Sequence, residues 1–105
     1  MDAEALFDDL AAELEPRGAL TGAMFGARSL KLGSKVFATT KNGRVTVKLG
    51  AGTGPHTEAL KVGEPFDPSG KGRPMKDWVT FDASLPDDVV AGFVVAALDR
   101  AQELA

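Results

Sequence analysis

The spacing of apolar residues predicts a helix at each end of the chain. Near the N-terminus an apolar stripe recurs every three or four positions, which predicts a helix over residues 3–15. This stripe is formed by Leu6, Phe7, Leu10, Ala11 and Leu14. Asp2 is a suitable N-cap for the helix, and Pro16 ends it. A wider stripe predicts a last, largely buried helix that begins near Ser84 or Pro86. That stripe is formed by Val89, Val90, Phe93, Val94, Ala97, Leu98 and Ala101.

Between the two helices the apolar period shortens towards two, which is typical of strands. Residues 21–32 predict a first strand and residues 35–40 a second, with a turn at Gly33-Ser34 between them. Asn42-Gly43 predicts a type I′ hairpin turn, because both residues tolerate the positive φ angles of that turn. The third strand follows at once and has two different faces. Its apolar face is formed by Val45, Val47 and Leu49. Its other face carries a base at each end and is formed by Arg44, Thr46 and Lys48.

The remaining segments complete an α+β pattern. A short helix is predicted over residues 56–62, an irregular loop rich in Gly and Pro over residues 63–74, and a fourth strand over residues 78–81. The order α-β-β-β-α-β-α predicts two layers, an antiparallel sheet (a β-meander plus a further strand) packed against the N- and C-terminal helices. Strands and helices do not alternate regularly, which argues against a parallel doubly wound sheet. The length predicts one domain over residues 1–105.

The composition places the chain among globular domains and removes several chemistries. Hydrophobic residues make up 44% and charged residues 26%, and the sequence holds no cysteine. It therefore has no disulfide, no thiolate metal ligand and no cysteine nucleophile. No segment approaches the roughly 18 consecutive apolar residues of a membrane helix. The acidic start Met-Asp-Ala-Glu is unlike a signal peptide, so we expect a cytoplasmic protein without membrane contact.

The net charge of −3 conceals acidic ends around a basic middle. Residues 1–20 hold six acids and one base, residues 21–81 hold ten bases and four acids, and residues 82–105 hold five acids and one base. Such asymmetry favours a docking surface for an anionic partner, either a nucleic acid or an acidic protein. The alternative interpretation is that Lys on the strands and Glu on the helices merely keep their outer faces solvated.

Two glycine-rich segments are similar to nucleotide-binding motifs but lack required residues. In residues 50–55, Pro55 stands where the third glycine of G-x-G-x-x-G belongs. In residues 69–74, Gly72 follows the lysine where a phosphate loop has Ser or Thr. We therefore predict no cofactor. The bases of this region still form a candidate anion-binding group that matches no nucleotide-binding motif. They are Lys71, Arg73 and Lys76.

No catalytic or metal-binding residue is predicted, and we expect the protein not to be an enzyme. His56 is the single histidine, and it has no second imidazole or thiol with which to build a usual zinc site. An exposed residue that caps the short helix is its expected role. Trp78 is the single tryptophan and has two interpretations. It anchors the sheet against the C-terminal helix, or it offers a stacking platform beside Arg73 and Lys76.

These observations lead to a main functional hypothesis and an alternative. The main hypothesis is a non-enzymatic interaction or regulatory module that meets an anionic partner with a basic sheet face and the loop at residues 63–74. Its candidate binding surface is formed by Arg28, Arg44, Lys48, Lys71, Arg73, Lys76 and Trp78. The alternative is a small-ligand pocket between the sheet and that loop, near Met24, Phe25 and Trp78.

Four short motifs, taken in order, resemble the TfoX N-terminal domain-like family and, more distantly, the MmcQ/YjbR-like proteins. The motifs are Met24-Phe25-Gly26, Lys35-Val36-Phe37-Ala38, Val45-Thr46-Val47-Lys48 and Arg73-Pro74-Met75-Lys76-Asp77-Trp78-Val79. The resemblance implies a compact domain with an antiparallel sheet. Full-length TfoX-type proteins are associated with natural competence and carry a second, C-terminal domain, which we do not expect here. The YjbR-like relatives have been suggested to bind DNA, which agrees with the basic middle of this chain.

Overall fold

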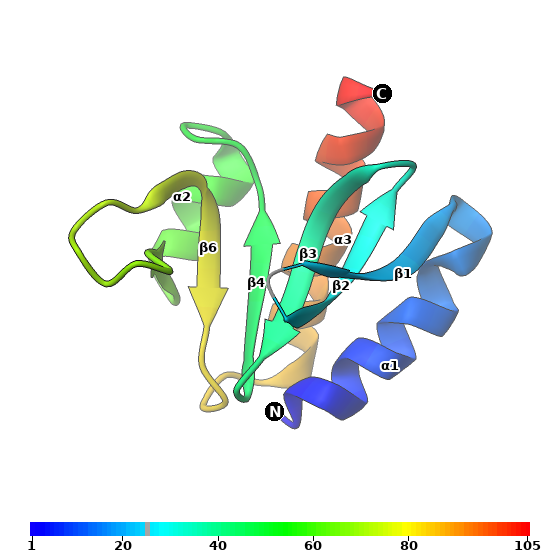
Figure 1. Ribbon diagram of the computed structural model, residues 1–105, viewed down its shortest axis with the longest axis horizontal. Helices are drawn as coiled ribbons and strands as arrows, with labels where there is room; N and C mark the ends of the chain where they lie inside the picture. The colour runs from blue at the N-terminus through cyan, green and yellow to red at the C-terminus, as the bar shows by residue number, and fades with distance from the viewer. Residues whose placement is uncertain (25) are drawn as a thin grey trace.

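The computed structural model describes residues 1–24 and 26–105 and shows three helices on one face of a six-stranded sheet (Figure 1). In chain order the elements are α1 (Ala3–Leu14), a 3₁₀ turn (Glu15–Arg17), β1 (Ala19–Met24), β2 (Ala27–Leu32), β3 (Lys35–Lys41), β4 (Arg44–Lys48), α2 (Gly54–Leu60), β5 (Glu64–Phe66), β6 (Met75–Phe81) and α3 (Asp87–Leu104). All neighbouring strands are antiparallel, in the order β1-β2-β3-β4-β6-β5. The predicted α+β class and antiparallel sheet are therefore confirmed.

Local signals placed both terminal helices correctly. The Asp2 carboxylate accepts a hydrogen bond from the Ala5 N–H at 3.2 Å, which caps α1. The chain leaves the 3₁₀ turn through Gly18, whose φ of 95° favours glycine. α3 begins directly after Pro86 with two acidic residues in its first turn, where they stabilise the helix dipole.

The predicted first strand is in fact a hairpin of two strands. Met24 pairs with Ala27, so the chain reverses between them, and the pairing continues along β1 and β2 as far as Ala19 with Leu32. Gly26 permits the reversal because its φ is +74°. The single predicted strand over residues 21–32 was wrong because its alternation continues on both sides of this tight turn. The sheet consequently begins with a four-stranded meander instead of a three-stranded one.

The hairpin between β3 and β4 has the predicted geometry. Asn42 and Gly43 have φ angles of 54° and 75°, as a type I′ turn requires.

The predicted short helix is α2, which begins two residues earlier than expected. The predicted irregular loop over residues 63–74 contains β5, a three-residue edge strand that pairs with β6. Pro65 within β5 agrees with an edge position, because proline cannot donate to a second neighbour.

The hydrophobic core lies between the sheet and the helices. α3 contacts β2, β3 and β4, α1 contacts β1 and β3, and α2 contacts β5 and β6. The largest fully buried side chains of this core include Phe7, Phe37 and Phe81. Strand alternation sends the intervening side chains to the opposite face, which none of the helices formed by the described residues covers; we call it the open face.

Candidate functional site

A row of hydroxyl side chains crosses the open face. Ser29 pairs with Thr39, Thr39 with Thr46, and Thr46 with Thr80, so one row runs through β2, β3, β4 and β6. All four residues are less than 9% exposed, although none of the described helices lies over them. Sequence reasoning missed this row. Its signal is a small hydroxyl residue at the non-apolar position of each of four strands, but the pairing is needed to align them.

Arg44 lies across this row and joins three strands. Its Nε donates to Thr80 Oγ1 at 3.1 Å, and its Nη2 donates to Glu64 Oε1 at 3.3 Å. The side chain therefore starts on β4, crosses β6 and reaches the edge strand β5. Two anchored nitrogens fix the position of the guanidinium on this face, and the exposed Glu64 carboxylate occupies one of its donor positions.

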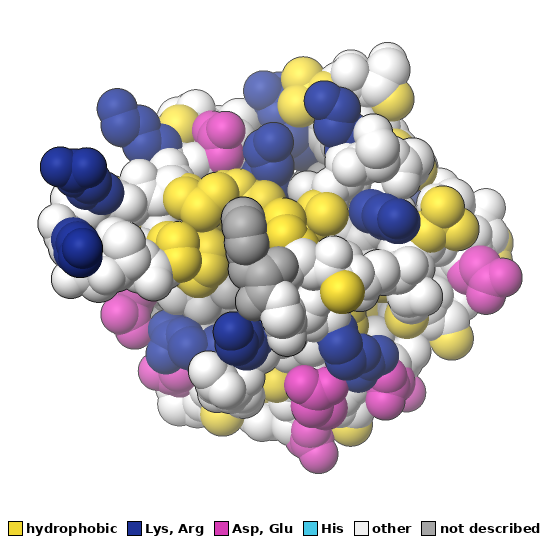
Figure 2. Space-filling model, in the orientation of Figure 1, with side chains coloured by type: hydrophobic (Ala, Val, Ile, Leu, Met, Phe, Trp, Pro, Cys, Tyr) yellow, Lys and Arg dark blue, Asp and Glu magenta, His cyan; other side chains and the backbone are white. Residues whose placement is uncertain are grey.

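A cleft of about 550 Å³ lies over the threonines. One side is formed by β1 and the β3–β4 turn, and the other by residues 64–68. Its lining combines hydroxyls, bases, two carboxylates and apolar side chains, including Met24, Thr39, Lys41, Arg44, Thr46, Glu64, Phe66, Asp67, Pro68 and Thr80. Figure 2 shows an apolar patch in the middle of this face with Lys and Arg side chains around it. Phe25, which was predicted to border a pocket here, lies outside the described residues.

The hydroxyl row offers a hydrogen-bond donor on the floor of this cleft. Thr80 Oγ1 accepts from Arg44 Nε and from the Thr46 hydroxyl, which is 3.0 Å away. These two bonds fill both acceptor positions of the oxygen, so the Thr80 O–H is left to donate. A polar group that enters the cleft meets this hydroxyl and the Arg44 guanidinium, which suit an acceptor or an anion. The two carboxylates of the lining are already engaged, Glu64 by Arg44 and Asp67 by the N–H groups of its own loop.

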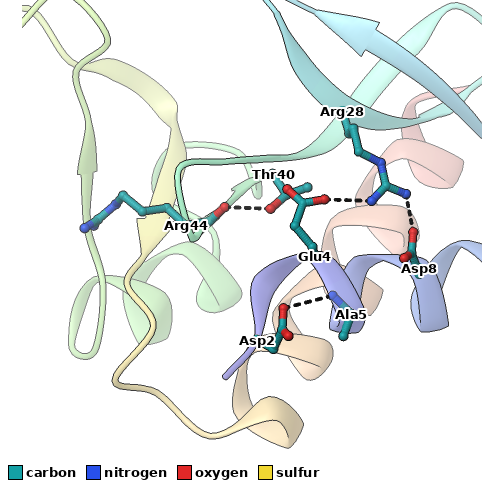
Figure 3. A network of polar contacts seen from close by, with 7 residues as sticks. All are labelled: Asp2, Glu4, Ala5, Asp8, Arg28, Thr40 and Arg44. Carbon is teal, nitrogen blue, oxygen red and sulfur yellow. Dashed lines mark hydrogen bonds and ion pairs between the residues drawn. The ribbon is translucent and has the colours of Figure 1, made fainter.

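The structure separates Arg28 from the other predicted site residues. Its Nη1 donates to Glu4 Oε2 at 2.8 Å and its Nη2 pairs with Asp8 (Figure 3). Its guanidinium also lies 5.6 Å from the Phe7 ring centre. The hydrogen bond to Glu4, followed by the one to Asp8, raises the pKa of Arg28. Arg28 thus ties β2 to α1, whereas Arg44 extends away from that helix (Figure 3).

A single carboxylate organises the loop that carries Lys71 and Arg73. Asp67 accepts hydrogen bonds from the N–H groups of Ser69, Gly70, Gly72 and Arg73, and from the Ser69 hydroxyl at 2.7 Å. The bond from the Ser69 hydroxyl is the main reason that the pKa of Asp67 is lowered. Both bases are exposed at the edge of the open face and make no ion pair within the described part of the chain.

Trp78 does not pack against the C-terminal helix, which was the first of its two predicted roles. It pairs with Lys48, is only 7% exposed, and lies outside the core cluster beneath the helices. Its ring centre is 6.4 Å from that of Phe66, at an interplanar angle of 53°. Trp78 therefore anchors the residues around β5 to the sheet and offers little ring surface for stacking.

His56 lies in α2 but does not cap it. The Thr53 hydroxyl accepts from the His56 N–H at 3.3 Å and is the N-cap. His56 Nε2 lies 2.9 Å from the carbonyl oxygen of Lys76 and so links α2 to β6. Among residues 1–24 and 26–105, no group of three or more His, Cys, Asp or Glu side chains is placed to hold a metal ion.

Comparisons with known proteins found no relative: no family model, curated protein or solved structure matches the chain. The resemblance to the TfoX N-terminal domain-like family stays a prediction. Across the described residues, no helix has both the length and the apolar content needed to span a membrane.

Proposed function

We propose that this domain is a non-enzymatic binding module that receives an anionic partner on its open face. The observation that carries the proposal is a group of bases that border this face and make no ion pair with a carboxylate in the part of the chain that the structure describes. They are Lys31, Lys48, Lys71, Arg73 and Lys76.

The acidic helices strengthen this arrangement by holding other bases on their own side. Arg28 pairs with two carboxylates of α1, while Arg17 and Arg100 pair with carboxylates of α3. Positive charge without a partner is thereby concentrated on the open face, although the net charge is −3. A local concentration of positive charge attracts a negatively charged partner even when the net charge of the protein is negative.

Binding of a labelled DNA duplex, followed by fluorescence anisotropy at 50 mM salt, tests the proposal. Lys71→Gln/Lys76→Gln removes two open-face charges, whereas Lys35→Gln/Lys61→Gln removes the same charge away from this face. We expect the first double variant to bind severalfold more weakly and the second to bind like the wild type. If the duplex does not bind, nucleic acid is excluded as the partner. Labelled polyglutamate then tests whether the partner is an acidic protein. Failure of both polyanions overturns the proposal.

The cleft favours a second candidate, a site for a small anion with an apolar body. Glu64 competes with such an anion for Arg44, so two substitutions should act in opposite directions. We expect Glu64→Gln to tighten binding of benzoate and Arg44→Gln to weaken it, each by about two- to fivefold, the range of exposed ion pairs. The measurement is an NMR titration of backbone amides. No shift at Thr39, Thr46 or Thr80 with either benzoate or phosphate would exclude this candidate.

A further inference from the structure

A second cavity lies away from the open face, at the far end of α3. The last turns of this helix extend past the end of the sheet (Figure 1), and a cavity of about 250 Å³ lies between them and the ends of β3 and β4. Its apolar lining is formed by Leu32, Val36, Phe37, Ala97, Ala101 and Leu104. Leu104 is 64% exposed at its rim, so apolar surface is available to a ligand.

Three bases from three elements surround this apolar lining. Lys35 comes from the start of β3, Lys48 from the end of β4, and Arg100 from α3. Neither lysine pairs with a carboxylate among the described residues. The acidic side chain in the lining is Asp77, and its Oδ1 already accepts from the Ala51 N–H at 2.8 Å. Among the side chains of the lining, three are therefore basic and one is acidic.

Arg100 is held at the cavity by close contact with the backbone. Its Nε is buried and has no hydrogen-bond partner among the described residues. A Cβ atom at Gly50 would lie 3.0 Å from this Nε, so only glycine allows the guanidinium to approach so closely. Its Nη1 is 3.5 Å from the exposed Glu103 carboxylate, which is a long contact. The guanidinium is thus positioned but only weakly neutralised, which leaves capacity for another anion.

We propose that this cavity binds a small amphipathic monoanion, a carboxylate on a short unbranched apolar chain. The carboxylate would lie among Lys35, Lys48 and Arg100, and the apolar chain against Phe37 and Ala101. Charge complementarity selects the anion, and the apolar lining selects its chain. This site lies at the end of the sheet and shares Lys48 with the surface proposed above, whereas Lys35, Arg100 and the apolar lining belong to this cavity and not to that surface.

The same bases also lie near the C-terminal end of α3, where cations stabilise a helix. A purely structural role predicts that their removal lowers stability without any effect on a ligand. The decisive measurement is therefore ligand binding and not the melting temperature alone.

The experiment is an NMR titration of backbone amides with octanoate and with the neutral octanamide. We expect octanoate to shift the amides of Val36, Gly50, Ala51 and Ala101, and to bind at least about tenfold more tightly than octanamide, equivalent to two exposed ion pairs. Equal binding of the two compounds, or shifts confined to the open face, would overturn the proposal. This comparison requires no variant.

Two variants then test separately whether binding needs the positive charge of Lys35 and the empty volume of the cavity. Lys35→Gln should weaken octanoate binding about two- to fivefold. The matched control Lys31→Gln, on the open face, should leave it unchanged. Ala101→Leu fills the cavity and should abolish detectable binding while the spectrum stays dispersed. Octanoate binding that is insensitive to both Lys35→Gln and Ala101→Leu would contradict the assignment to this cavity.

Discussion

Gly63 and Gly92 show how differently two glycines can act in one fold. A Cβ atom at Gly63 would lie 2.7 Å from the Phe81 ring and 2.8 Å from the Thr80 carbonyl oxygen. Phe81 is fully buried and Thr80 is strand backbone, so neither neighbour can move aside easily. A Cβ atom at Gly92, in the middle of α3, would meet nothing within 4 Å. The first glycine is required by packing, and the second only weakens a helix.

Alanine at these two positions should therefore have opposite effects on stability. We expect Gly63→Ala to lower the free energy of unfolding by about 1–3 kcal/mol, the usual range for an overpacked core. Gly92→Ala should raise it by about 0.5–1 kcal/mol, because alanine favours the helix. Urea denaturation measures both. Equal changes of the same sign would mean that the close approach at Gly63 is not present in solution.

At the scale of elements, Arg28 joins α1 to the sheet. Its two carboxylate partners come from successive turns of that helix, and all three side chains are about half exposed. Ion pairs of this exposure contribute modestly and are screened by salt. Arg28 therefore makes its contacts on the helix side of the sheet, and we propose a structural role for it instead of its predicted place in the binding surface.

Arg28→Gln should destabilise the fold without affecting the proposed docking. We expect the free energy of unfolding to fall by about 0.5–1 kcal/mol at low salt and by less at 1 M salt. Duplex binding should match that of the wild type. A loss of binding as large as that of Lys71→Gln/Lys76→Gln would return Arg28 to the binding surface.

The Asp67 loop should depend on pH in a predictable direction. Because hydrogen bonds lower the pKa of Asp67 in the folded protein, its ionised form stabilises the loop. That contribution is complete above the pKa of an unfolded aspartate and disappears as the pH falls through the lower folded value. We expect the amide signals of Gly70 and Gly72 to shift together with that titration.

Asp67→Asn provides the matching substitution. An asparagine keeps the shape but has one acceptor oxygen, so several of the N–H bonds are lost. Hydrogen exchange of the Gly72 and Arg73 amides should become faster at neutral pH, while global unfolding changes little because the loop is exposed. Unchanged exchange would show that the loop does not depend on this carboxylate.

At the scale of the whole molecule, the placement of all three helices on one face of the sheet determines which surface presents unpaired positive charge to a partner. The acids lie largely on the helices and the unpaired bases largely around the open face. Binding that depends on this surface should be strongly salt-dependent. With two to three phosphates contacted, the affinity for duplex DNA should fall about ten- to fortyfold between 50 and 200 mM salt. Lys71→Gln/Lys76→Gln should flatten this dependence, whereas a salt-independent affinity would exclude a phosphate contact.

Much of the architecture follows from local patterns. The apolar stripes located both terminal helices, because a helix must bury one side whatever its neighbours are. Asn42-Gly43 located a hairpin, because few residues accept its backbone angles. The alternation around Thr46 correctly placed Arg44 and Lys48 together on the face opposite Val45 and Val47.

Other features depend on contacts between distant segments. Alternation is the same before and after a tight turn, so it did not separate β1 from β2. The hydroxyl row needs the register of four strands, and the contact of Arg44 with Glu64 needs β6 between them. None of these relations has a local signal, because strand pairing joins residues that are far apart along the chain.

The amino-acid order thus sets which residues share a side of each helix or strand, since that depends only on the periods of 3.6 and 2 residues. It leaves open which strands pair, in which register they pair, and where strand ends meet α3. Those choices are made by packing, which buries the apolar side, exposes the hydroxyl row to a cleft, and brings Lys35, Lys48 and Arg100 around one cavity.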